Sequence, residues 1–150
     1  MHVHHLMTRE LRSCGPDDFL SLPAQSMWEA DVGAIPVVDD GTVVGMITDR
    51  DICIAAHTKG RLLSEIRVRE VMAQNVVTCG WNDSIRRVEA IMQEQRVRRV
   101  PVVDISNRLV GIVSLNDLAR TAHPTFRGQT ELVATLAAIC EPRRPMGSAA

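Results

Sequence analysis

Two short runs in this chain place a hydroxyl three residues before a carboxylate. Thr48 precedes Asp51, and Ser114 precedes Asp117. This spacing is typical of a capping box, in which the hydroxyl accepts a backbone N–H at the start of a helix and the acid lies favourably beside the helix dipole. The same groups could bind a ligand, because unpaired N–H groups at a helix start suit a phosphate and a carboxylate accepts hydrogen bonds from ribose hydroxyls. The two interpretations are compatible, so each run is both a candidate cap and a candidate ligand site.

Both runs belong to a longer motif that occurs twice in the chain. Pro36–Asp39 recurs as Pro101–Asp104, and Val44–Gly45 recurs as Val110–Gly111. A repeat of this length predicts two supersecondary units that need one another to close a core. It also implies an approximate internal two-fold axis and, with it, two related clefts.

Each copy has the same expected order of elements, α–β–α–β–β–α. It begins with a short helical turn, Val3–Met7 in the first copy and Val68–Met72 in the second. The apolar strands Ala34–Val38 and Arg99–Val103 are each followed by a turn, a return strand and a helix that begins at the hydroxyl. The strand–helix–strand step predicts parallel pairing, and the closing hairpin is antiparallel. The fold class is therefore α/β (α+β) with a small mixed three-stranded sheet in each copy. Pro23 lies in the first long helix, which should be kinked or begin late.

The repeat divides the chain into four segments that together form one module. We expect the first motif in residues 1–56, a linker in residues 57–67 and the second motif in residues 68–122. The remaining residues, 123–150, are expected to form a C-terminal helix and a tail.

The composition is that of an ordinary globular domain. The 150 residues are 45% hydrophobic and 23% charged, with a net charge of −1, so the charge balance indicates neither a nucleic-acid nor a membrane-surface partner. No apolar run approaches the roughly 20 residues of a membrane span, and no signal peptide is visible, which favours a cytoplasmic protein. The four cysteines form no CxxC pair and are expected to be reduced and mostly buried.

The sequence contains no recognisable catalytic or metal-binding motif. It lacks GxSxG, HExxH, a P-loop and any paired metal-ligand spacing. His2, His4 and His5 are expected to lie in a solvated, mobile N-terminus. We therefore predict no catalytic residue, no metal site and no required cofactor.

The repeated pattern resembles the CBS (cystathionine β-synthase) motif, two copies of which form a CBS pair, or Bateman module. The resemblance covers roughly residues 3–120, because the Pro-Val-Val-Asp strand, the hydrophobic-Gly-hydrophobic strand and the Thr/Ser-x-x-Asp run recur in order in both copies. The runs Asp31–Pro36, Thr48–Asp51 and Val97–Pro101 look like those of small stand-alone bacterial CBS proteins of the hypoxic response protein 1 group.

The resemblance implies two clefts between the copies, each able to hold an adenine nucleotide such as AMP, ADP or ATP. In such modules the acid usually holds the ribose and the hydroxyl lies near the phosphate. Carried over by motif position, the first candidate site groups Thr48, Asp51, Met46, Arg98, Arg99 and Ser13. The second groups Ser114, Asp117, Ile112, Gly33, Ala34, Arg50 and Thr78. Because only the first site has an arginine pair, which matches phosphate oxygens bidentately, we expect it to bind more tightly.

The function expected from this resemblance is non-enzymatic regulation. The module would sense an adenine-type ligand and act on a protein effector in trans. We expect a homodimer that associates through helices, with the C-terminal helix either adding to the interface or covering the module. The alternative is a structural or interaction module that binds no nucleotide, and an enzyme is a remote alternative.

Overall fold

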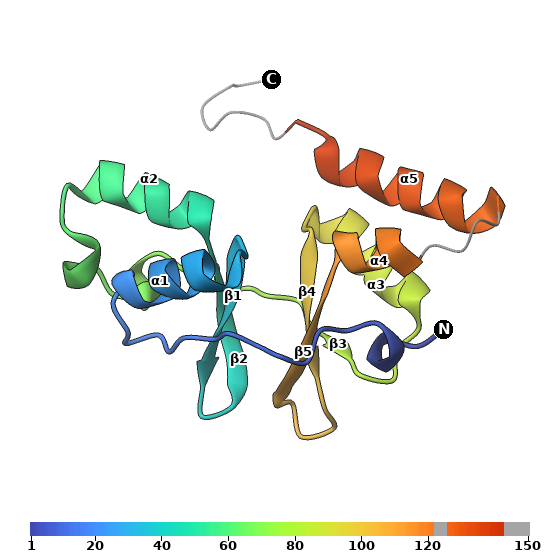
Figure 1. The fold of residues 1–150 in the computed structure, drawn as a ribbon, viewed down its shortest axis with the longest axis horizontal. Coiled ribbons are helices and arrows are strands. Elements are labelled where there is room, and N and C mark those ends of the chain that lie inside the picture. The colour runs from blue at the N-terminus through green and yellow to red at the C-terminus, as the bar shows by residue number, and fades with distance from the viewer. Residues whose placement is uncertain (122–125, 143–150) are drawn as a thin grey trace.

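Two α/β halves lie side by side in the molecule, one for each copy of the repeat (Figure 1). The computed structural model describes residues 1–121 and 126–142, so residue 122 of the expected second motif and residues 123–125 and 143–150 of the expected C-terminal segment lie outside it. The first half contains α1 (Ser21–Ala30), β1 (Ala34–Asp39), β2 (Thr42–Thr48) and α2 (Asp49–Lys59). The second half contains β3 (Cys79–Gly80), α3 (Ile85–Gln95), β4 (Arg99–Val103), β5 (Leu109–Ser114), α4 (Leu115–Thr121) and α5 (Phe126–Cys140). Short 3-10 turns, Val3–His5, Leu63–Glu65 and Val68–Glu70, connect these elements.

The mixed sheet expected for each copy is complete in the second half. There β3 pairs with β4 in parallel, and β4 pairs with β5 antiparallel. In the first half β1 and β2 form the antiparallel pair, and the third strand is reduced to one parallel bridge between Cys14 and Val37. The cause is Pro16, which stands where the second copy has Trp81. The Trp81 N–H donates to Val103 O at 3.0 Å, whereas proline has no N–H with which to continue the ladder.

The first long helix begins late, as its proline predicts. Helix α1 starts at Ser21, so Pro23 lies in the first turn, where its missing N–H breaks no helical hydrogen bond. The helix ends at Asp31, which takes a left-handed conformation (φ 51°).

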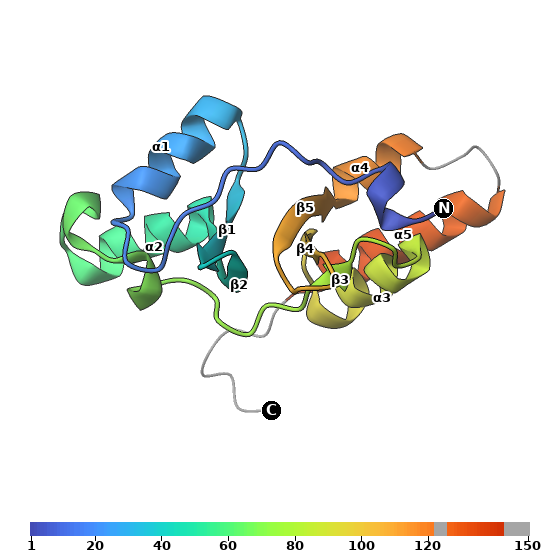
Figure 2. The same cartoon turned by 90° about the horizontal axis from the view of Figure 1, so that it is seen from below.

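The two halves exchange their first turns, which the order of the chain does not reveal. Val3 is fully buried in the core of the second half, and its N–H donates to Asp83 O at 3.0 Å. Val68 is fully buried in the core of the first half, and its N–H donates to Asp18 O at 2.8 Å. The N-terminus accordingly runs beside α3 and α4 rather than beside α1 (Figure 2). Each core is therefore completed by the first turn of the other copy.

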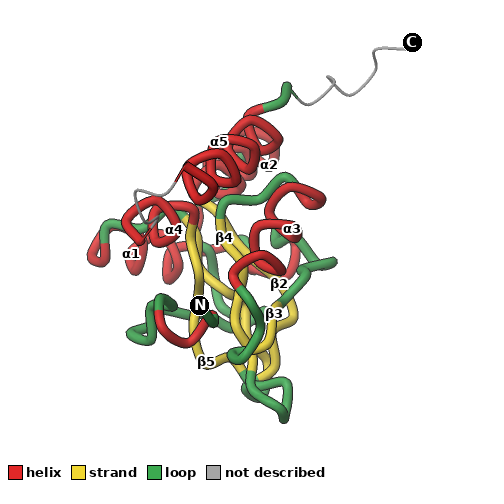
Figure 3. Tube along the Cα trace, turned by 90° about the vertical axis from the view of Figure 1, so that its right-hand side faces the viewer, coloured by secondary structure: helices red, strands yellow, loops and turns green. Residues whose placement is uncertain are grey.

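Helix α5 covers one side of the second half (Figure 3). Leu132 and Ile139 pack against the core there, and Gln93 of α3 donates to Thr135 Oγ1 at 2.8 Å. Of the two roles expected for the C-terminal helix, this packing corresponds to covering, and it covers the second half. No helix of the described residues has the length and apolar character needed to cross a bilayer.

The four cysteines divide into two classes, so the expectation of mostly buried thiols holds for two of them. Burial raises the pKa of Cys14 and of Cys79 to about 12, with a smaller contribution from Asp18 and Asp83 respectively. Cys53 and Cys140 are exposed.

We predict that the native protein titrates only two thiols rapidly with an aromatic disulfide reagent at pH 8. A thiol attacks as its thiolate, and at pH 8 a group with a pKa of about 12 is almost wholly protonated. The protein unfolded in guanidinium should titrate all four. Rapid titration of four thiols in the native protein would contradict the buried positions of Cys14 and Cys79.

Candidate functional site

Both Thr/Ser-x-x-Asp runs form capping boxes at the start of a helix. In the first copy Thr48 Oγ1 accepts the Asp51 N–H at 3.1 Å, and Asp51 Oδ2 accepts the Thr48 N–H at 3.0 Å. In the second copy Ser114 Oγ accepts the Asp117 N–H at 3.2 Å, and Asp117 Oδ2 accepts the Ser114 N–H at 2.8 Å and its hydroxyl at 2.6 Å. The other oxygen of each carboxylate, Oδ1, makes no hydrogen bond to the described residues and remains available as an acceptor.

Strand register places the residues before each strand proline at the hydroxyl of their own copy. Arg99 lies opposite Ser114 in the β4–β5 pair, and the Leu115 N–H donates to Arg98 O at 2.9 Å. Ala34 likewise lies opposite Thr48 in the β1–β2 pair. The arginine pair is therefore adjacent to the hydroxyl of the second copy.

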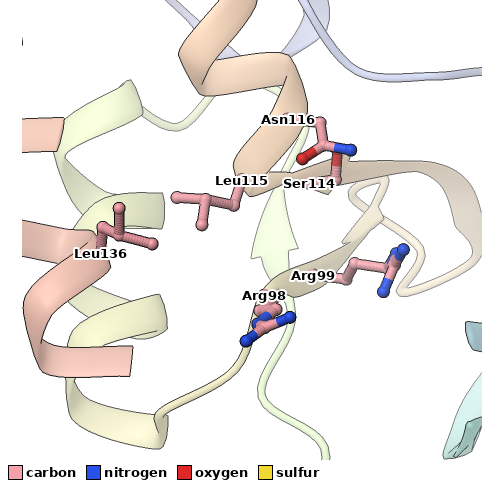
Figure 4. A pocket seen from close by; sticks show the side chains of 6 residues that line it. All are labelled: Arg98, Arg99, Ser114, Leu115, Asn116 and Leu136. Atoms are coloured by element: carbon pink, nitrogen blue, oxygen red, sulfur yellow. The ribbon is translucent and has the colours of Figure 1, made fainter. Parts of the chain in front are cut away.

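These residues line a pocket of about 290 Å³ between β4, α4 and α5 (Figure 4). Its lining is formed by Arg98, Arg99, Ser114, Leu115, Asn116 and Leu136. The two leucine side chains point toward one another, while the two guanidinium groups lie away from them on the side of β4. The volume is near the lower end of the roughly 300–1,000 Å³ typical of small-molecule pockets.

Neither arginine of the pocket is neutralised by an acid of the described residues. The ion pairs among the described residues involve other cations, such as Arg61 with Glu70 and Arg69 with Asp17. Arg98 is exposed and Arg99 is half-buried. Two guanidinium groups on one pocket wall without a carboxylate partner form a surface that suits an anion.

The residues of the first candidate site come from both halves, as a cleft between the copies requires. No hydrogen bond or ion pair of the described residues joins Arg98 or Arg99 to Thr48 or Asp51. Met46 exchanges backbone hydrogen bonds with Ala73, at 3.0 and 2.9 Å, and so lies against the segment that joins the copies. Ser13 is exposed and precedes the bridge residue Cys14.

The residues of the second candidate site likewise come from both halves. Ser114 and Asp117 lie in the second half, where Ile112 pairs with Thr8, and Thr78 directly precedes β3. Gly33, Ala34 and Arg50 lie in the first half, around the start of α2. A Cβ at Gly33 would lie 3.0 Å from Asp49 Oδ2, so a side chain there would require the exposed Asp49 carboxylate to shift slightly.

Three pocket residues were not assigned to a site from the sequence. Asn116 and Leu115 follow Ser114 directly, so their position in the motif was a usable signal. Leu136 lines the pocket from α5. Its position there depends on how α5 packs on the second half, which local sequence patterns do not predict.

The N-terminal histidines are held against the second half, which corrects the expectation of a mobile terminus. His2 Nδ1 lies 2.9 Å from Asn82 O, and His4 Nδ1 lies 3.2 Å from Trp81 O. Within residues 1–121 and 126–142, no three His, Cys, Asp or Glu side chains are grouped as a metal site would require.

The molecule is a tandem-repeat module of two sequence-related α/β halves. The halves exchange a turn, and in each of them a capped helix begins beside the hairpin. The CBS domain model matches residues 3–57 and 68–123, and the chain belongs to the CBS domain family as a tandem pair. The resemblance inferred from the repeated motif is thereby confirmed.

The relatives of the chain include small proteins of the same size class. Hypoxic response protein 1 of Mycobacterium tuberculosis is 35% identical over 138 residues, which are 91% of this chain and 92% of the relative. The CBS domain-containing protein YhcV of Bacillus subtilis is 39% identical over 117 residues, which are 78% of this chain and 82% of the relative.

Two solved structures are informative about the site. Hypoxic response protein I with two coordinated zinc ions superposes with a TM-score of 0.73 at 35% identity, covering 81% of this chain and 98% of that one. The CBS domain pair of protein MJ0100 in complex with 5′-methylthioadenosine and S-adenosyl-L-methionine has a TM-score of 0.72 at 26% identity, covering 80% of this chain and 94% of that one.

Proposed function

We propose that this CBS pair is a non-enzymatic regulatory module that binds a phosphate-bearing adenosyl ligand, such as AMP, ADP or ATP, in the pocket of the second copy. The observation that carries the proposal is the Arg98–Arg99 pair, which has no acidic partner among the described residues and lines a pocket with Ser114 and Asn116. A guanidinium forms two parallel hydrogen bonds with phosphate oxygens, and hydrogen bonds to charged groups are worth about 1.5–3 kcal/mol each.

The remaining groups give the pocket a polar and an apolar side. Asn116 and the Ser114 hydroxyl line the pocket and can bind polar atoms of the ligand. Asp117 does not line the pocket but caps the same helix start, where its Oδ1 could accept a hydrogen bond from a ribose hydroxyl. Leu115 and Leu136 provide an apolar surface on which a purine ring can pack. The bound ligand would thus touch both the capped start of α4 and the C-terminal helix.

The relatives support an adenosyl ligand but not one particular compound. The MJ0100 pair was solved with two adenosyl compounds that carry no phosphate. Two unpaired arginines favour an anion, so we propose that this chain prefers a nucleotide to a neutral nucleoside or a sulfonium compound. Because Leu136 belongs to α5, ligand binding would be reported through that helix to an effector protein in trans, in the cytoplasm.

The alternative is a structural CBS module without a nucleotide. It is favoured by the capping boxes, because both hydroxyls and one oxygen of each carboxylate are already satisfied within the protein.

Thermal unfolding with AMP, ATP, NAD, S-adenosylmethionine and 5′-methylthioadenosine distinguishes the nucleotide-binding module from the structural one. A ligand present at 100 times its dissociation constant stabilises by about 2.7 kcal/mol. A higher melting temperature with AMP or ATP supports the proposal, and a melting temperature unchanged by all five compounds favours the structural module.

We predict that Asp117→Asn weakens AMP binding about tenfold or more, whereas Asp51→Asn changes it little. Both carboxylates cap a helix in the same way, so the two variants lose a similar cap and control for one another. Only Asp117 lies in the copy that carries the arginine pair, and loss of a charged acceptor costs about 1.5–3 kcal/mol. Isothermal titration calorimetry measures both affinities. A larger loss in Asp51→Asn would restore the grouping of the arginines with the first copy.

A further inference from the structure

A second pocket in the second half lies where the N-terminus, α3, α4 and α5 meet (Figure 2). Its volume is about 350 Å³, and it shares no lining residue with the pocket of the arginine pair. Ile85, Leu118 and Leu132 line it, and all three belong to the core of the second half or pack against that core. The pocket therefore offers a hydrocarbon surface to a small ligand, and its volume lies within the range of small-molecule sites.

The charged side chains of this pocket are two glutamates and one arginine, Glu89, Glu131 and Arg86. Arg86 pairs with Glu131 at 3.8 Å, which is longer than a direct hydrogen bond. Glu89 is half-buried and makes no hydrogen bond or ion pair within residues 1–121 and 126–142. Burial raises the pKa of the Glu89 carboxyl, the neighbouring Glu131 raises it as well, and Arg86 opposes them. The pocket therefore contains a carboxylate that lacks a cation, which is costly where water is partly excluded.

The first copy of the repeat shows that the fold does not need this carboxylate. In the alignment of the two copies Glu89 stands where the first has Ala24, which packs against the first core. Thr121, another lining residue, stands where the first copy has the buried Ala55. A methyl group is thus sufficient at both places, whereas the second copy brings two carboxylates of neighbouring helices into one pocket, where they repel. Proteins break such local rules mainly at functional sites.

We propose that this pocket binds an aliphatic primary amine. The ammonium group lies between Glu89 and Glu131, and the hydrocarbon chain packs on the apolar lining. An ammonium group has three N–H donors, so it can satisfy both carboxylates at once. The apolar lining favours an amine over a metal ion, because an ion has no hydrocarbon with which to cover it.

The bound amine also joins two helices. Because Glu89 belongs to α3 and Glu131 to α5, an ammonium group replaces their repulsion by attraction to both. Binding therefore strengthens the packing of α5 on α3. The amine site and the proposed nucleotide site have no lining residue in common, so each stands or fails separately.

The first test is an NMR titration of the ¹⁵N-labelled protein at neutral pH with butane-1,4-diamine, butylamine and 1-butanol. These probes have the same hydrocarbon chain and differ in their ammonium groups. We expect both amines to shift the amide resonances of Glu89, Leu118 and Glu131 to saturation. 1-Butanol should bind at least about tenfold more weakly than butylamine, because it carries no charge. Equal affinity for 1-butanol and butylamine, or amine-induced shifts at exposed acids outside the pocket instead, would overturn the proposal.

The second test uses variants of the unpartnered carboxylate. Glu89→Gln should weaken butylamine binding about tenfold or more, because it removes the charge and keeps the shape of the side chain. Glu94→Gln is the matched control, since Glu94 is exposed on the same helix and does not line the pocket. Arg98→Ala/Arg99→Ala should leave butylamine binding unchanged, which separates this site from the nucleotide pocket. Wild-type affinity for butylamine in Glu89→Gln would overturn the proposal.

A stability measurement shows whether Glu89 serves the fold instead. Glu89→Ala introduces the residue of the first copy and should also lose butylamine binding. Its melting temperature without ligand should be equal to or higher than that of wild type, because the variant removes a half-buried carboxylate that has no partner. A melting temperature below that of wild type would mean that the carboxylate stabilises the fold, and would contradict the proposed role.

Discussion

Replacing Arg98 and Arg99 together with alanine is expected to weaken AMP binding about 100-fold and to leave adenosine binding unchanged. Both guanidinium groups line the pocket beside Ser114 and have no acidic partner in the described part of the chain. Charge-assisted hydrogen bonds to phosphate are worth about 1.5–3 kcal/mol each, and two of them account for at least this factor. Adenosine has no phosphate and so loses none of these bonds.

Isothermal titration calorimetry of wild type and double variant against both ligands measures the effect. The affinity of the wild type for AMP should also fall with added salt, because part of the attraction is screened charge, whereas the double variant should lose most of this dependence. Arg12→Ala is a suitable control, since its side chain pairs with Glu29 in the first half, far along the chain from the pocket. If the double variant keeps the wild-type preference for AMP over adenosine, the arginines do not bind the phosphate.

Deleting residues 1–7 is expected to lower the free energy of unfolding by about 3 kcal/mol or more. The segment contains the first turn of the first copy but completes the core of the second half, where Val3 is fully buried. Burial of one valine alone contributes about 1.5–3 kcal/mol, and Leu6 and Met7 pack against the same core. The deletion also removes the backbone hydrogen bonds of Val3 and His4 to Asp83 and Trp81.

Urea unfolding followed by tryptophan emission measures this loss. Trp81 lies in the second half beside His4, with ring centroids 5.6 Å apart, so its part of the emission reports the affected half, and Trp28 reports the first half. Ile105→Ala, at an almost fully exposed position, should leave the unfolding free energy nearly unchanged. An unfolding midpoint for the deletion equal to that of wild type would show that the N-terminal turn contributes nothing to the second core.

The local elements of the fold follow from residue pattern, because their causes are local. Thr48 and Ser114 begin helices since a hydroxyl and an acid three residues later satisfy the free N–H groups there. The tight turn before Thr42 follows from Asp40 and Gly41, both of which take positive φ. These features need only neighbouring residues to form.

The exchange of first turns could not be predicted in the same way. Val3 and Val68 occupy equivalent places in the repeat and are chemically identical, so nothing in their type indicates which core each one enters. The choice depends on the path of the connecting chain and on the shape of both cores.

Motif analogy groups the arginine pair with Thr48 and Asp51 of the other copy, and that grouping stays a prediction, whereas the adjacency of the pair to Ser114 has a local cause. The turn at Asp104–Arg108 closes a hairpin, and a one-residue bulge between Val102 and Val103 then sets the register that puts Arg99 opposite Ser114. Pairing within the hairpin thus predicts the neighbours of Arg99 within its own copy, but the bulge that completes the register is not evident from the residue pattern. The position of Leu136 in the pocket depends on how α5 packs, which cannot be predicted from the pairing of a hairpin.

The most direct test of the central claim is a crystal structure of the protein with AMP at saturating concentration. We expect the phosphate within hydrogen-bonding distance of the Arg98 or Arg99 guanidinium and of Ser114, with a ribose hydroxyl on Asp117. AMP bound at Thr48 and Asp51 with both arginines in solvent, or no density for AMP at all, would contradict the account.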